Sequence, residues 1–248
     1  MKFINKYQSS NFNKRKSGSS IKYIIIHYTA IEDYFEAIQH LCSKDNKVSC
    51  HFLINKKGAI YYLVNTKNRA WHAGQSYWNK DTDINSESIG IEMVNSGHHI
   101  LFESYNLNQI KALIKLLQYL VNKYKIDPIN ILGHSDIAPY RKIDPGQKFP
   151  WKKISKNNIV FKLKKLSNKK KDELDYFLYK KFKNSQKKKV LFILKSIGYN
   201  IKPATKSDKK YIILIKAYQM HFRQKNVSGK IDRETYKILL SHYNQILT

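Results

Sequence analysis

The run of β-branched and aromatic residues from Ile21 to Tyr28 is the feature that most restricts how this chain can fold. A short apolar run of this kind is typical of a buried strand, and His27 lies close to its end. Similar short runs predict further strands at residues 51–55, 59–64, 89–94 and 129–132. The chain therefore has to bury a β-sheet.

Helical periodicity separates these strands. Apolar residues recur at helical spacing over residues 107–125, and Asp127-Pro128 then ends the pattern. A shorter helix is expected from Glu32 to Ser43. Because strands alternate with helices, we expect an α/β fold in which helices flank a mixed β-sheet.

The second part of the chain has a different character. Residues 1–151 contain 20 Lys and Arg against 12 Asp and Glu, whereas residues 152–248 contain 26 against 6. Apolar periodicity over Val190 to Ile197 and over about Asp208 to Arg223, with a last helix near the C-terminus, predicts a small all-α domain of three helices. We expect four segments: a flexible N-terminal segment (1–20), the α/β domain (21–155), a basic linker or helical lead-in (156–185) and the helical domain (186–248).

The formal net charge of +28 indicates an anionic partner, such as nucleic acid, a membrane surface or an acidic polymer. An A+T-rich genome would also produce a chain rich in Lys, Asn, Ile and Tyr, so the origin of the charge stays open. No recognised nucleic-acid motif accompanies it, and we expect no nucleic-acid partner. We find neither a signal peptide nor a transmembrane segment, which favours a cytoplasmic protein; a periplasmic or envelope-associated one is the alternative.

Residues 133–146 form a loop by composition and concentrate reactive side chains. His134 follows a predicted strand directly, and Asp144 lies further along the loop. Zinc in hydrolases usually takes three protein ligands and leaves a fourth position for water. His27, His134 and Asp144 could form such a site if their strands are neighbours. His51 and His72 are rival ligands, although His51 alternates with apolar residues and is expected to be packed.

Five motifs occur in an order that resembles the zinc-dependent N-acetylmuramoyl-L-alanine amidases of type 2, the family that includes peptidoglycan recognition proteins. They are Ile26-His27-Tyr28-Thr29-Ala30, Ser49-Cys50-His51-Phe52-Leu53-Ile54, Arg69-Ala70-Trp71-His72-Ala73-Gly74, Ser88-Ile89-Gly90-Ile91-Glu92-Met93-Val94-Asn95, and the loop from Gly133 that ends in Phe149-Pro150-Trp151.

The resemblance implies a role for each matching residue. His27, His134 and Asp144 match the ligands of a Zn²⁺ cofactor, Glu92 the acidic residue that assists the attacking water, and Lys142 the lysine that stabilises the oxyanion. An Asp as third ligand is similar to the branch of the AmpD and AmiD amidases. The implied reaction hydrolyses the amide between the lactyl group of N-acetylmuramic acid, or its 1,6-anhydro form, and L-alanine, in peptidoglycan turnover or recycling.

Arg69, Trp71 and His72 are expected to line a cleft that meets sugar or peptide, although Trp71 could equally be a core residue. Asp136 is expected to brace its loop. We expect a monomer that acts on peptidoglycan or muropeptides. The alternative is a recognition protein that binds these ligands without cleaving them, and the complete ligand set argues against it.

Motifs in the helical domain resemble the three-helix peptidoglycan-binding domain attached to many wall hydrolases. They are Ser196-Ile197-Gly198-Tyr199, Ala217 to Arg223 and Gly229 to Thr235. Such an attached domain would raise the local concentration of substrate around the catalytic part.

Overall fold

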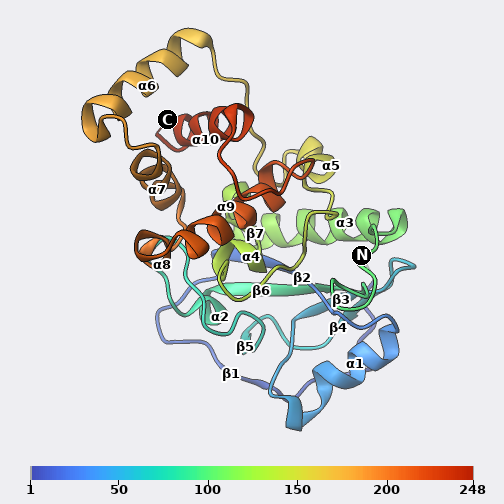
Figure 1. Ribbon diagram of the computed structural model, residues 1–248. Coiled ribbons are helices and arrows are strands. Elements are labelled where there is room, and N and C mark those ends of the chain that lie inside the picture. Colours follow the sequence, from blue (N-terminus) through green and yellow to red (C-terminus); the bar gives the residue numbers. More distant parts are fainter. Residues whose placement is uncertain (1, 248) are drawn as a thin grey trace.

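A mixed five-stranded β-sheet forms the centre of the computed structural model, which describes residues 2–247 (Figure 1). The strand order is β4-β3-β6-β2-β7, with parallel pairing throughout except between β3 and β4. The strands are β2 (Tyr23–Tyr28), β3 (Phe52–Ile54), β4 (Ile60–Tyr62), β6 (Ser88–Met93) and β7 (Ile131–Gly133). The sheet and its flanking helices confirm the predicted fold class.

The two faces of β2 pack against different layers. Ile24 and Ile26 belong to the core under α3 (Leu107–Tyr124), whereas Ile25 belongs to a second core. The strand is buried along its whole length because both of its faces are covered. Helix α3 is the helix predicted over residues 107–125.

Helix α1 (Tyr34–Cys42) packs against the β3–β4 end of the sheet through Ala37, Ile38 and Leu41. Short elements connect the larger ones. They are η1 (Lys44–Asn46), β5 (Asn68–Ala70), α2 (Ile84–Glu87), η2 (Pro128–Asn130), α4 (His134–Ile137), α5 (Trp151–Ile154) and η3 (Ser155–Asn157).

Residues 2–20 differ from the flexible segment expected at the N-terminus. β1 (Phe12–Lys14) pairs with β5 in the antiparallel sense. The buried side chains of Ser9 and Asn11 donate hydrogen bonds of 2.7–2.9 Å to backbone carbonyls of residues 41, 43 and 48. The expectation of flexibility is corrected here, because the polar side chains pair with buried backbone groups instead of facing water.

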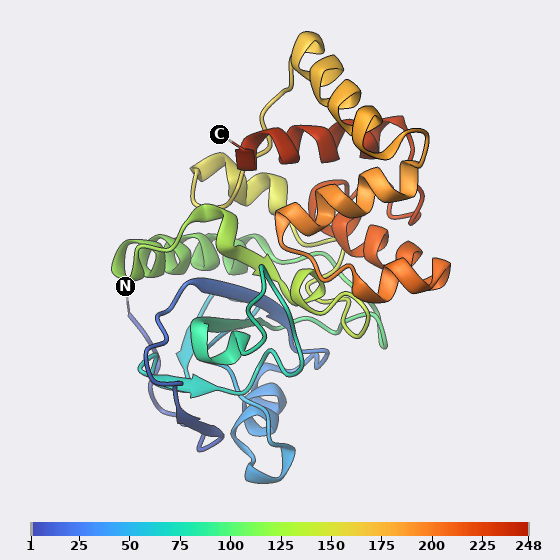
Figure 2. The ribbon, with the colours of Figure 1, turned by 90° about the vertical axis from the view of Figure 1, so that its left-hand side faces the viewer.

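Five helices make up the C-terminal part, which gathers at the opposite end of the molecule from α1 in both ribbon views (Figures 1 and 2). They are α6 (Asn168–Phe182), α7 (Gln186–Ile197), α8 (Lys202–Lys206), α9 (Asp208–Phe222) and α10 (Arg233–Leu247). Helices α7, α9 and α10 correspond to the three expected helices. Within residues 2–247, none of the helices has the length and apolar character needed to cross a membrane.

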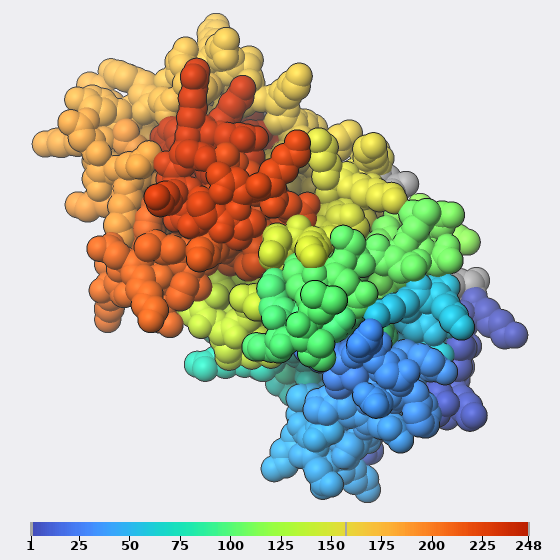
Figure 3. All heavy atoms as spheres, turned by 45° about the vertical axis from the view of Figure 1, so that its right-hand side comes forward, coloured from blue at the N-terminus to red at the C-terminus, as the bar shows by residue number. Residues whose placement is uncertain are grey.

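The C-terminal helices share one hydrophobic core with the sheet. Trp78, Leu132 and Ile137 lie in the same buried cluster as Leu194 and Tyr218. In the space-filling view, orange and red atoms of these helices lie directly against the yellow-green atoms that follow β7 (Figure 3). The C-terminal part therefore forms a layer that covers the sheet.

Candidate active site

Neighbouring parallel strands bring the predicted metal ligands together. Because β2 pairs with β6 on one side and β7 on the other, the carboxyl ends of these three strands meet at one edge of the sheet. His27 lies near the end of β2, and His134 opens the short helix α4 directly after β7, where the sequence predicted a loop. A Cβ on Gly133 would lie 2.7 Å from Cδ of Pro145, so this glycine lets the loop that carries Asp144 come close.

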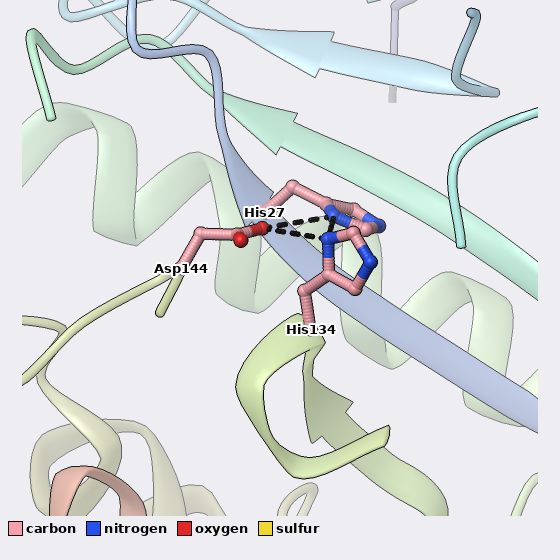
Figure 4. Close-up of side chains that lie close together, drawn as sticks. All are labelled: His27, His134 and Asp144. Carbon is pink, nitrogen blue, oxygen red and sulfur yellow. Dashed lines mark hydrogen bonds and ion pairs between the residues drawn. The ribbon is translucent and has the colours of Figure 1, made fainter. Parts of the chain in front are cut away.

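The side chains of His27, His134 and Asp144 point toward one another (Figure 4). The two Nδ1 atoms are 3.0 Å apart, and Oδ2 of Asp144 lies 3.1 Å from Nδ1 of His27 and 3.0 Å from Nδ1 of His134. The three residues are 1%, 3% and 7% exposed. The structure thus brings the predicted triad together in a buried cluster.

The outer nitrogens of both histidines have hydrogen-bond partners. Nε2 of His134 lies 3.0 Å from the carbonyl oxygen of Ala73, which can only accept, and 3.3 Å from Nη2 of Arg141, which can only donate; because the carbonyl is nearer, we assign the proton to this Nε2. Nε2 of His27 lies 3.0 Å from Nδ1 of His72, and Nε2 of His72 lies 3.2 Å from the hydroxyl oxygen of Ser88. The Ser88 hydroxyl donates to a backbone carbonyl, so we assign His27 as donor to His72 and His72 as donor to Ser88.

Three electron-pair donors therefore converge without a proton between them. Each Nδ1 presents a lone pair because Nε2 is protonated, and Asp144 adds a carboxylate oxygen. Their separations of 3.0 and 3.1 Å are close to the edge of about 3.3 Å in a tetrahedron with zinc bonds of about 2.0 Å. A cation at the centre relieves the mutual repulsion of the donors, so these residues fit a zinc ion.

Burial and mutual charges set the protonation of these ligands. The pKa of His27 is lowered to about 4, first by burial and then by the neighbouring His134, against the opposing effect of Asp144. Burial would raise the pKa of Asp144, but its contacts with the neighbouring imidazoles, His134 first and then His27, hold this pKa well below its usual range. A neutral imidazole and an ionised carboxylate are the forms that bind metal.

Glu92 lies beside the triad because it pairs with His27 in the register of β6 and β2. The pKa of Glu92 is raised to about 8, first by burial and then by the charge of Asp144, against the opposing effect of Lys142. Among the described residues, Oε2 of Glu92 has no hydrogen-bond partner. A carboxyl group with a pKa near neutral and a free oxygen is suited to proton transfer.

A cavity of about 290 Å³ joins these groups. Its walls include all five residues predicted as ligands or catalytic groups, namely His27, Glu92, His134, Lys142 and Asp144. The cavity therefore has room for a small part of a substrate next to the triad.

His72 borders the cavity and also contacts the side chain of His27. Its ring packs on Gly90 of β6, where a Cβ would lie 2.4 Å from Cγ of His72. Both ring nitrogens are engaged, one with His27 and the other with Ser88. The structure thus places His72 in contact with the candidate ligand His27.

The other two predicted cleft residues differ from each other. Trp71 borders the cavity, and its indole nitrogen donates to the side chain of Asn13 at 2.9 Å. Arg69 is not among the cavity residues, because its guanidinium pairs with Asp83 at 2.9 Å. The expectation that Arg69 lines the cleft is therefore corrected.

His51 is packed beneath the sheet edge, as expected, and is not a ligand of this cluster. Its Nδ1 accepts the backbone N–H of Gly90 at 3.0 Å, and its Nε2 lies 3.1 Å from the carbonyl oxygen of Asn68. The residue is fully buried.

Arg141 is one of the cavity residues that were not predicted from the sequence. Its Nη2 donates to the carbonyl oxygens of Ala73 and Gln75 at 2.7 and 3.0 Å. Arg141 therefore holds the same carbonyl that accepts the proton of His134. Its position directly before Lys142 was the available signal, since charged residues on such loops commonly serve a site.

A buried pair of histidines and an aspartate at parallel strand ends, with a carboxyl group and a lysine beside them, defines a metal-dependent hydrolase. The model of the N-acetylmuramoyl-L-alanine amidase family matches residues 17–147. The chain is 35% identical over 243 residues to the amidase AmiD of Escherichia coli strain K12, across 91% of this chain and 84% of AmiD. The chain therefore belongs to the type 2 N-acetylmuramoyl-L-alanine amidase family and is an amidase.

Solved structures agree along nearly the whole chain. E. coli AmiD in complex with the substrate anhydro-N-acetylmuramic acid-L-Ala-D-γ-Glu-L-Lys matches with a TM-score of 0.76 and 31% identity, over 94% of this chain and 93% of AmiD. AmpDh3 from Pseudomonas aeruginosa matches with a TM-score of 0.79 and 30% identity, over the full length of both chains. The similarity thus includes the C-terminal helices.

Proposed function

We propose that this amidase uses zinc, held by His27, His134 and Asp144, to hydrolyse the amide between the lactyl group of N-acetylmuramic acid, or of its 1,6-anhydro form, and L-alanine. The observation that carries the proposal is the convergence of three unprotonated donors next to Glu92 and Lys142 in one cavity. The substrate in the AmiD complex contains the anhydro sugar joined to L-alanine, which supports this choice of bond. Peptidoglycan turnover or recycling is the process that such a reaction serves.

Zinc supplies a Lewis acid and makes water more acidic when it is bound. Glu92 takes a proton from the attacking water while the water oxygen bonds to the lactyl carbonyl carbon. The carbon–nitrogen bond then breaks, and Glu92 returns the proton to the alanine nitrogen. The products are a lactyl carboxylate and a stem peptide with a free amine, which takes up the proton that the new carboxyl group releases.

Lys142 provides the positive charge that faces the reacting oxygen. The tetrahedral intermediate carries a negative charge that the substrate carbonyl lacks, so a fixed cation stabilises it selectively. Arg141 is less suited to this role because its guanidinium already donates to the carbonyls of Ala73 and Gln75.

Zinc content and cleavage test the proposal together. Zinc-loaded wild type should release free stem peptide from an anhydro-muropeptide, as measured by mass spectrometry. Asp144→Asn should lose both zinc and cleavage, because the amide offers no anionic ligand. Lys142→Met should keep zinc and lose about 10²–10³-fold in kcat. The control is Lys152→Met, which changes an exposed lysine outside the cavity and should leave both quantities unchanged.

Two results would contradict the proposal. Cleavage by Asp144→Asn at the wild-type rate, or by zinc-free protein, would exclude the zinc mechanism. Binding of the muropeptide by zinc-loaded wild type without any cleavage would indicate a recognition protein instead. Parallel incubations with intact sacculi and with released anhydro-muropeptides would show which form of peptidoglycan reaches the cavity.

A further inference from the structure

Asp136 is a buried carboxylate that the reaction does not use. It is fully buried, and it lies in α4, the short helix that begins with the ligand His134. Its Oδ2 accepts the backbone N–H of Gly133 at 2.8 Å, which closes the turn between β7 and α4. A buried carboxylate needs several donors, because each unpaired oxygen lone pair in a low-dielectric interior is costly.

The C-terminal helices supply the other donors. The hydroxyl of Tyr199, which follows α7, donates to Oδ1 of Asp136 at 2.5 Å. Nδ1 of His221 in α9 lies 2.7 Å from Oδ2, and this ring stacks on Trp151 with 3.8 Å between ring centroids. Tyr199 and His221 are 1% and 6% exposed, so water does not replace them.

The turn that Asp136 stabilises determines where His134 and Asp144 lie in the proposed metal site. His134 stands two residues before Asp136, and the backbone N–H of Ser135 donates to the carbonyl of Asp144 at 2.8 Å. Two of the three ligands are thus attached to α4, one as its first residue and the other through a hydrogen bond. A rotation of this turn would move both donor atoms away from His27.

We propose that Tyr199 and His221 are positioning residues for the metal site. They hold the carboxylate of Asp136 so that α4 presents His134, and with it Asp144, in the orientation that binds zinc. This inference rests on the zinc site proposed above and extends it: the C-terminal helices take part in metal affinity through a buried hydrogen-bond network. Groups that orient metal ligands typically change affinity by about 10–100-fold when they are removed.

Tyr199→Phe tests this inference, with Tyr218→Phe as the matched control. Tyr218 is also a fully buried tyrosine of the C-terminal helices, but its hydroxyl lies 3.4 Å from Nδ1 of His242, and among the described residues it makes no hydrogen bond to Asp136. The dissociation constant for zinc alone is measured by competition with a chelator. Tyr199→Phe should weaken zinc binding by about tenfold, and Tyr218→Phe by less than twofold.

A second pair of variants distinguishes positioning from general loss of structure. His221→Leu removes the donor, whereas His221→Asn places an amide N–H near the position of Nδ1. Zinc affinity should fall in the leucine variant and recover in large part in the asparagine variant, while urea unfolding of the metal-free proteins reports their stability. Recovery in stability without recovery in zinc affinity would overturn the inference.

Equal zinc affinity of Tyr199→Phe and wild type would overturn the inference while leaving the zinc site intact. Equal weakening by Tyr199→Phe and Tyr218→Phe would overturn it as well, because the effect would then follow from any lost hydroxyl in this layer. If wild type itself binds no zinc, the proposed function fails and not only this extension.

Discussion

Glu92→Gln should make the metal-free protein more stable at neutral pH. The pKa of Glu92 is about 8 in the folded protein against an ordinary value of 4.5. At pH 7 the folded protein keeps this group protonated, whereas the unfolded chain gains free energy by ionising it. Each pKa unit corresponds to about 1.4 kcal/mol. At pH 7 the free energy of unfolding of the wild type is therefore lower by about 3 kcal/mol, a loss that the glutamine variant does not have.

The sign of the pH dependence follows from the same values. Between pH 4.5 and about 8 the folded state binds more protons at Glu92 than the unfolded state, so wild-type stability falls as pH rises. The difference between the variant and the wild type should be about 1 kcal/mol at pH 5.5 and reach 4 to 5 kcal/mol, roughly, above pH 8. His27 and Asp144 titrate in both proteins, and their effects largely cancel in the difference.

Urea unfolding followed by tryptophan fluorescence, in the presence of a chelator, measures these differences at each pH. The same substitution should lower kcat by about 10²–10⁴-fold in the zinc-loaded protein, because the amide cannot accept the water proton. A stability difference that does not change with pH would refute the raised pKa of Glu92. Full activity of the variant would refute its catalytic role.

Two further substitutions test the supports of the site. His72→Leu removes the acceptor of the His27 Nε2 proton and should weaken zinc binding by about 10–100-fold in a chelator competition; unchanged affinity would contradict the assigned tautomers. Arg15→Met removes donors to the buried carbonyls of Ser86 and Ser88, at 2.8 and 2.9 Å, and should lower the free energy of unfolding by about 2–4 kcal/mol. The control Lys16→Met changes an exposed side chain, and an equal effect of both substitutions would contradict a structural role for the N-terminal segment.

Local patterns were sufficient to predict most of the sheet and the long helix. The runs that became β2, β3, β4, β6 and β7 are short and apolar, and the repeat in residues 107–125 has the period of a helix. Such signals depend only on residues near one another in sequence, so they can be recognised without knowledge of the tertiary structure. The predicted ends of these elements differ by at most two residues from those in the structure, because hydrogen bonding and caps set the final boundaries.

The candidate metal ligands were predictable in part. Spacing indicated that His27 and His134 end two strands, but only the ordered family motifs singled them out among nine histidines. Their convergence depends on the pairing of β2 with β7 and on the absence of a Cβ at Gly133. The role of His72 lay beyond the sequence, since the ring has to pack on Gly90 of another strand before it can reach His27.

The N-terminal segment was mispredicted because polarity was taken to mean solvation. Ser9, Asn11 and Arg15 are polar, yet their side chains are partners of backbone carbonyls that the folded domain leaves unpaired. Composition records the polarity of a side chain and not the identity of its partner. The same limit applies to Asp136, whose bracing role was expected but whose donors, Tyr199 and His221, lie far along the chain.

The position of the C-terminal helices can be explained from the sequence of β2. Every residue of β2 except His27 is apolar or aromatic, so both faces of this strand have to be covered. Helix α3 covers one face through Ile24 and Ile26, and the first part of the chain offers no second long helix for Ile25. The helices beyond residue 151 complete this second layer, together with Trp78, Ile84 and Ile137 from the first part. A domain recruited to complete a core lies close enough to the metal ligands to orient them, which a domain on a free linker does not.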